Sequence, residues 1–258
     1  MIQSQFIITT GDNFYEHGVD YIDDPHWHQS FEEVYAHPSL HTTWYPTLGN
    51  HDYHGNIQAQ IDYSRHNSRW HLPARYYALE KTINDATKVQ LIFLDTTPFR
   101  ECYRLGDGER IHNVDGQEPQ EQLAWLRATL AMSDAPWKCV IGHHPIYSGS
   151  PFHGGAPELQ ELVLPILREY EVQVYFCGHE HDLQYLCSPD VHFVVSGAGA
   201  AYRETGLDTY TDFCASTLGF TAVSLHADRM QIDFYNANGQ RLYRTNILRT
   251  LSSVVPMI

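Results

Sequence analysis

Four short polar turns, each placed directly after an apolar, strand-like run, are the feature of this sequence that most restricts its fold. The turns read GDN at 11–13, GNHD at 49–52, GHHP at 142–145 and GHEH at 178–181. In open α/β sheets, ligands bind beyond the carboxyl ends of the strands, so turns of this kind converge there. The sequence therefore predicts an α/β protein with one polar site at its strand ends.

The rest of the sequence alternates between strand-like and helical segments. Strands are expected at residues 5–9, 44–48, 89–94, 138–142, 172–177 and 192–196. Helices are expected at residues 25–35, 57–65, 119–131 and 157–169. Short strands that alternate with helices are typical of the α/β class.

The last part of the chain has a different pattern. Residues 219–225 and 230–235 alternate between apolar and polar side chains. Asn238 and Gly239 then form a strong hairpin signal before a further run at 241–246. Antiparallel strands are therefore predicted at this end.

Length and charge limit the classes of protein that fit. The 258 residues suit one large domain, which we place at 1–247, followed by a tail at 248–258. A formal net charge of -15 argues against a nucleic-acid partner, because an acidic surface repels phosphate backbones. No run is apolar and long enough to span a membrane, so no membrane partner is expected. An acidic protein that acts on anions needs local positive charge, and without a Lys/Arg cluster bound metal is a candidate source.

The polar turns carry a set of possible metal ligands. The candidates are Asp12, Tyr15, Asn50, His51, His143, His179 and His181. Carboxylate, phenolate, amide and imidazole donors without a thiolate suit iron, manganese or zinc. One such turn alone is a weak indication, since most Gly-Asp-Asn sequences are only turns. Four of them in this order supply enough ligands for two ions, and a carboxylate such as Asp12 can bridge both.

With these motifs, the sequence resembles the calcineurin-like metallophosphoesterase superfamily, and within it the small purple acid phosphatases of the tartrate-resistant type. The resemblance runs from Phe6 to about Asn246 and includes GDNFYEHGV, WYPTLGNHDYHGN, CGHEHDLQYL and VVSGAG. Its most specific residue is the tyrosine of GDNFY, a ligand of Fe(III) in purple phosphatases. The resemblance implies an α/β fold built as a four-layer α/β/β/α sandwich, with two mixed sheets flanked by helices.

The resemblance also assigns ligand roles to residues of this sequence. Asp12 would bridge an Fe(III) ion and a divalent ion, which would be Fe, Zn or Mn. Tyr15 and His181 would bind the iron. The divalent ion would be held by Asn50, His143 and His179.

Two further histidines would act on the substrate. The resemblance places His51 against the substrate and His153, in the segment SPFHGG, near the leaving group. Both are candidates for the general acid, a role that histidine fills near neutral pH. His144 fills a position that the family leaves variable, and no ligand role is expected for it.

The implied reaction is the hydrolysis of phosphate monoesters by an acid phosphatase, through direct attack of a metal-bound hydroxide and without a phosphoenzyme. Small phosphomonoesters are the expected substrates. Two alternatives stay open: a phosphodiesterase or nucleotide pyrophosphatase of the same superfamily, and an inactive metal-binding protein. The family resemblance favours a secreted, periplasmic or lysosomal protein, and the sequence does not indicate the oligomeric state.

One family motif is absent from the expected place. The family has a D-x-G motif upstream of GDNFY, whose Asp binds the iron-type metal, but residues 1–11 contain no Asp. We therefore expect a chain that lacks the first strand and helix, or a variant that has lost one ligand. In either case, the strand that ends at Thr9 would have an exposed edge.

Overall fold

A mixed seven-stranded sheet forms the centre of the computed structural model, which describes residues 4–83, 87–105 and 111–249. Its strand order is β3-β4-β5-β6-β8-β7-β9. These strands are β3 (Tyr77–Ile83), β4 (Thr87–Phe93), β5 (Trp137–Ile141), β6 (Val174–Cys177), β7 (Leu183–Cys187), β8 (His192–Ser196) and β9 (Thr211–Ala215). Strands β4, β5, β6 and β8 are parallel to one another, whereas β3 and β7 run antiparallel to their neighbours.

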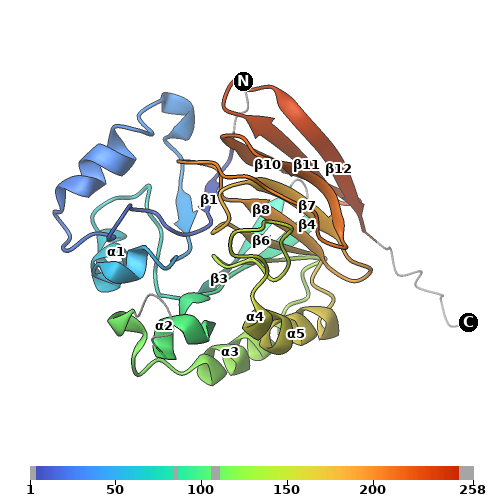
Figure 1. The fold of residues 1–258 in the computed structure, drawn as a ribbon, viewed down its shortest axis with the longest axis horizontal. Helices are drawn as coiled ribbons and strands as arrows, with labels where there is room; N and C mark the ends of the chain where they lie inside the picture. Colours follow the sequence, from blue (N-terminus) through green and yellow to red (C-terminus); the bar gives the residue numbers. More distant parts are fainter. Residues whose placement is uncertain (1–3, 84–86, 106–110, 250–258) are drawn as a thin grey trace, which may run out of the picture.

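Helices cover one face of this sheet (Figure 1). They are α3 (Pro119–Ala131), α4 (Pro157–Leu162) and α5 (Leu164–Glu169). Helix α3 has the predicted bounds, and its buried Leu123, Leu126 and Leu130 repeat at helical spacing and face the sheet. The single helix predicted at 157–169 is instead two helices, because Pro165 lacks the N–H that a continuous helix would use.

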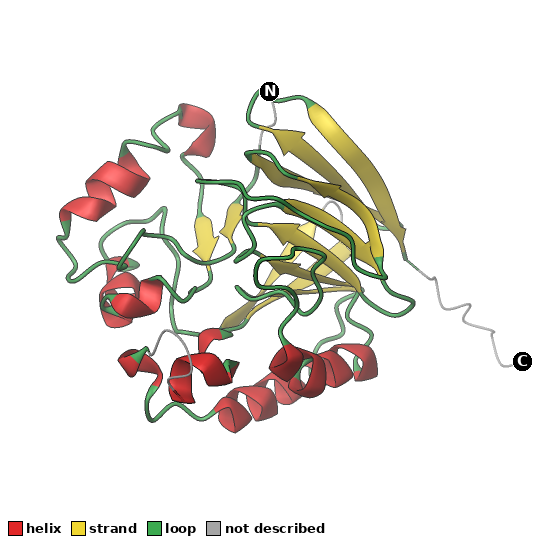
Figure 2. Ribbon diagram, in the orientation of Figure 1, coloured by secondary structure: helices red, strands yellow, loops and turns green. Residues whose placement is uncertain are grey.

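A three-stranded antiparallel sheet packs on the other face of the central sheet (Figure 2). It consists of β10 (Gly219–Leu225), β11 (Arg229–Asn236) and β12 (Arg241–Leu248). The predicted hairpin is confirmed, and Gly239 takes the left-handed conformation of its turn, with φ of 75°. Contact between the sheets is aromatic, with the rings of Phe213 and Phe234 5.0 Å apart.

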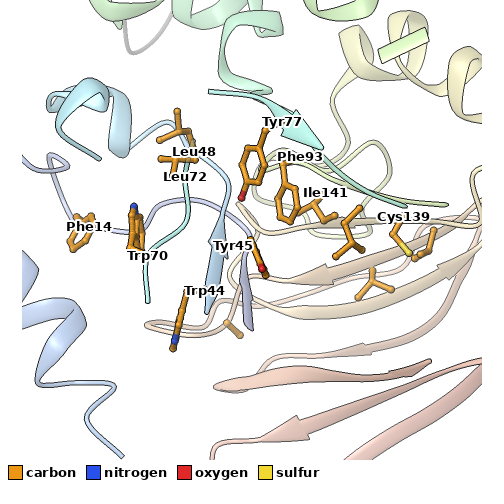
Figure 3. Close-up of a cluster of buried hydrophobic side chains, with 14 of the residues drawn as sticks. Phe14, Trp44, Tyr45, Leu48, Trp70, Leu72, Tyr77, Phe93, Cys139 and Ile141 are labelled. Atoms are coloured by element: carbon orange, nitrogen blue, oxygen red, sulfur yellow. The ribbon is translucent and has the colours of Figure 1, made fainter. Parts of the chain in front are cut away.

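A smaller parallel pair of strands, β1 (Ile7–Thr9) and β2 (Trp44–Pro46), precedes the first two polar turns. Its surroundings are rich in aromatic rings, and Phe14 meets Trp27 edge-on at 4.6 Å. Figure 3 shows this cluster, which continues from Phe14 and Trp70 toward Phe93 of the central sheet. The first two turns are thereby fixed on a rigid apolar base.

Short helical segments complete the fold. Helix α1 (Ile57–Tyr63) begins after Asn56, whose side chain accepts hydrogen bonds from the N–H groups of Gln58 and Ala59. The helix expected at 25–35 is a π-helix over Trp27–Glu32. The remaining segments are α2 (Glu101–Leu105) and the 3-10 turns Pro38–Leu40, Asp52–His54, Thr97–Phe99 and His112–Val114. No helix in the described ranges is long and apolar enough to cross a membrane.

The structure differs from the sequence prediction in its strands and sheets. Strands β3, β7 and β9 were not expected, and β7 could not show an alternating pattern because its first four residues are all buried. Three hydrogen-bonded sheets are present, rather than two mixed ones, because β1 pairs only with β2 among the described residues and β10–β12 bond only to each other. The four-layer arrangement stays a prediction. Of the predicted tail, residues 250–258 lie outside the described residues.

Candidate metal centre

The four polar turns meet at the carboxyl ends of β1, β2, β5 and β6, where convergence was predicted. Asp12 has a positive φ of 54° and His179 one of 65°, conformations that non-glycine residues adopt rarely. Glycine is required at position 49, next to Asp12, since a Cβ there would collide with the Asp12 carboxylate. The backbone is therefore shaped to bring these side chains together.

One group of donors surrounds the Nε2 atom of His143. This atom lies 3.0 Å from Asn50 Oδ1, 3.2 Å from His179 Nδ1 and 3.3 Å from Asp12 Oδ2. The other ring nitrogen, Nδ1, contacts the Thr10 carbonyl oxygen at 2.8 Å. Because Nδ1–H donates to that carbonyl, Nε2 is the atom that faces the centre.

A second group of donors lies on the other side of Asp12. The Tyr15 hydroxyl is 3.1 Å from Asp12 Oδ2 and 3.1 Å from His181 Nε2. Asp12 Oδ2 thus belongs to both groups. This is the position that a bridging carboxylate needs between two ions.

A second carboxylate, on Asp52, holds the loops in place. It is fully buried and accepts hydrogen bonds from the backbone N–H groups of Asn13 at 3.0 Å and Gly49 at 2.8 Å. Gln60 of α1 donates a third bond at 2.9 Å. Burial, together with the charge of Asp12, raises the pKa of Asp52 to about 6. Asp52 therefore ties the first turn to the second.

The charges in the centre suit a cation. Burial lowers the pKa of both His179 and His181, which keeps these imidazoles in the neutral form that binds metals. Burial alone would raise the pKa of Asp12, but the electrostatic interaction and hydrogen bond with His143, followed by the interactions with His51, dominate, and the pKa falls. Asp12 is therefore a carboxylate. Burial and the Asp12 charge raise the pKa of Tyr15, so its ionisation requires a nearby cation.

The residues present fit a binuclear metal centre. Carboxylate, amide and phenol oxygens and three imidazoles crowd together, with atoms that could bind a metal 3.0–3.3 Å apart. His143, His144 and His179 also form a cluster whose ligand atoms lie within 4.8 Å of one another. His144 differs from the others, because its two nitrogens contact the hydroxyls of Thr96 at 2.8 Å and Tyr103 at 3.2 Å. Because both ring nitrogens are engaged by these hydroxyls, His144 is not placed as a metal ligand.

The two candidate acids occupy different surroundings. His51 Nδ1 contacts the Glu16 carbonyl oxygen at 2.8 Å, and its ring lies 4.7 Å from that of Tyr15. His153 lies next to His179 instead of Tyr15, with the two imidazole rings 4.4 Å apart. Burial and the nearby Arg203 lower the pKa of His153.

Arg203 itself was not predicted. Its Nη1 atom lies 3.3 Å from His153 Nε2, and its backbone N–H donates to the His181 carbonyl at 2.7 Å. No motif marks this arginine in the sequence, because it lies in an irregular loop 22 residues after His181. The position of Arg203 beside the centre becomes visible only once the fold of that loop is known.

Comparison with known proteins identifies the family. Residues 2–183 match the family model described as calcineurin-like phosphoesterase. The match covers more than half of the sequence, and the chain belongs to this family.

The relatives narrow the group. Purple acid phosphatase 4 of Arabidopsis thaliana is 35% identical over 96% of this chain and 75% of its own length. Tartrate-resistant acid phosphatase type 5 of Homo sapiens is 32% identical over 96% of this chain and 81% of its own length. The chain is thus similar, over nearly all its length, to acid phosphatases of the purple, tartrate-resistant type.

Solved structures share the fold. GAP50, the anchor in the inner membrane complex of Plasmodium, superposes with a TM-score of 0.82 at 22% identity, covering 96% of this chain and 80% of that one. Purple acid phosphatase PPD1 from yellow lupin seeds has a TM-score of 0.70 at 18% identity, covering 95% of this chain and 46% of that one. These similarities establish the architecture and nothing about substrates.

Proposed function

We propose that this protein is an acid phosphatase that hydrolyses small phosphate monoesters at a centre of two metal ions. The observation that carries the proposal is the position of Asp12 Oδ2, which lies 3.3 Å from the imidazole of His143 and 3.1 Å from the phenol of Tyr15. One carboxylate oxygen thus serves two groups of ligands. The similarity to purple acid phosphatases across the chain supports this choice.

Each ion has its own set of residues in this proposal. Tyr15 and His181, with Asp12, would hold Fe(III), and Asn50, His143 and His179, again with Asp12, would hold a divalent Fe, Zn or Mn ion. When bound, the two ions neutralise the phosphate and acidify a water molecule for attack. The reaction needs no serine or cysteine nucleophile, so we propose direct displacement without a phosphoenzyme.

The leaving alkoxide requires a proton, and His51 is the better donor. The Glu16 carbonyl accepts from Nδ1 and thereby orients the ring, so Nε2 is free to carry the transferred proton. His153 is less suited to this role, because burial and Arg203 disfavour its protonated form. We assign proton donation to His51 and a contact with the leaving-group side to His153.

Substitution of Asp12 tests the proposal. In protein reconstituted with iron and zinc, Asp12→Asn should lose both ions and reduce the turnover of p-nitrophenyl phosphate at least about a hundredfold. Asp228→Asn, at an exposed turn, is the matched control. Wild-type turnover and metal content in Asp12→Asn would contradict the site.

The two alternatives give different results in the same assay. A phosphodiesterase would cleave bis-p-nitrophenyl phosphate faster than the monoester. An inactive metal-binding protein would hold one ion per chain and turn over neither ester. By resemblance, we expect the active protein in a secreted, periplasmic or lysosomal setting.

A further inference from the structure

Arg203 is a positive charge beside the candidate metal centre that has no part in the ligand set. Its guanidinium lies over the ring of Phe152, with Cζ 4.0 Å from the ring centroid. Nη1 contacts His153 Nε2 at 3.3 Å, and the backbone N–H donates to His181 at 2.7 Å. The side chain is half-buried and is thus fixed to loops on both sides of the centre.

Arg203 has no acidic ion-pair partner among the described residues. Seven of the other arginines pair with carboxylates, namely Arg65, Arg100, Arg127, Arg168, Arg229, Arg241 and Arg244. Among the residues that the structure describes, Arg203 forms no ion pair, although the protein has a net charge of -15. Its direct contacts are the Phe152 ring and the His153 imidazole, and the Glu180 carboxyl group interacts with it only over a longer distance, without an ion pair.

The geometry leaves donors available for a ligand. A guanidinium has five N–H groups in a planar fork that matches two oxygens of a phosphate, and His153 uses one nitrogen of this fork. The Phe152 ring fixes the plane of the fork without using its N–H groups. Phe152 is itself 61% exposed, so the fork lies at the solvent-exposed edge of the candidate centre.

We propose that Arg203 binds the phosphoryl oxygens of the substrate and of the product phosphate, on the His153 side of the metal centre. The choice of a phosphate as ligand rests on the proposed function. The residue supplies the local positive charge that an acidic protein needs to attract an anion. His153 and Phe152 act as positioning residues that hold the guanidinium.

Binding of inorganic phosphate to the metal-loaded protein tests this inference. By isothermal titration calorimetry, Arg203→Gln should weaken phosphate binding about ten- to a hundredfold, because charge-assisted hydrogen bonds are lost. Arg203→Lys should recover part of the affinity, since it keeps the charge but not the fork. Arg168→Gln is the matched control, because it breaks the ion pair between Arg168 of α5 and Asp190, and it should bind phosphate with the affinity of the wild type.

Metal content and thermal unfolding of each variant show whether the protein is intact and loaded. In turnover assays, Arg203→Gln should raise KM more than it lowers kcat. Wild-type phosphate affinity in intact, loaded Arg203→Gln overturns the inference, whether or not the protein is a phosphatase. Arg203-dependent phosphate binding without ester hydrolysis supports the inference and overturns the proposed function.

Discussion

Replacing Asp95 by asparagine should make the stability of the metal-free protein less dependent on pH. Asp95 follows β4 and is 1% exposed, and its carboxylate accepts a hydrogen bond from the Tyr53 hydroxyl. Tyr53 lies in the 3-10 turn next to His51, so this bond anchors the turn that carries the proposed acid. Burial raises the pKa of Asp95 from 3.8 to about 7.

The size of the effect follows from this pKa. The folded state binds the proton more tightly than the unfolded state, so the stabilisation is fully present below pH 3.8 and is lost as the pH rises through about 7. Since each pKa unit corresponds to about 1.4 kcal/mol, the loss amounts to at most about 4 kcal/mol. Asparagine keeps the shape and an acceptor for Tyr53 but does not ionise. Asp95→Asn should therefore gain stability relative to wild type as the pH rises.

Urea unfolding, followed by tryptophan fluorescence in the presence of a chelator, measures this difference. The free energy of unfolding of Asp95→Asn minus that of wild type should increase by about 2–3 kcal/mol between pH 5 and pH 8. Asp190→Asn, an exposed carboxylate on the surface, is the control and should show no such trend. A difference that is the same at both pH values would refute the reasoning.

Two further predictions concern the metal centre. His51→Ala should slow the hydrolysis of alkyl phosphates about a hundredfold more than that of p-nitrophenyl phosphate, because the nitrophenolate leaving group needs little protonation. Equal losses on both substrates would argue against an acid role. Tyr15→Phe should abolish the visible phenolate-to-iron absorption of the iron-loaded protein, while the divalent ion stays bound to the ligands around His143. An unchanged absorption spectrum would show that Tyr15 is not an iron ligand.

Local sequence patterns were sufficient for elements whose burial repeats regularly. Helix α3 was predicted because one face of it is buried at helical spacing, and the hairpin between β11 and β12 because Asn-Gly sets its turn. Strand β7 was missed for the opposite reason, since both of its faces are covered and no alternation remains. The break at Val163 follows from Pro165, because proline lacks the N–H that a continuous helix would use.

The sequence by itself determined which donor atoms are available, because the chemistry of carboxylate, phenol, amide and imidazole belongs to the residue types. It also placed these donors after strands, where they can converge. Which atoms meet was decided only by the tertiary structure. Tyr15 and His181 are 166 residues apart in the chain, yet their side chains lie 3.1 Å apart. Arg203 reaches His153 through an irregular loop, which carries no periodic signal, so only the packing of that loop against its neighbours could bring its charge to the centre.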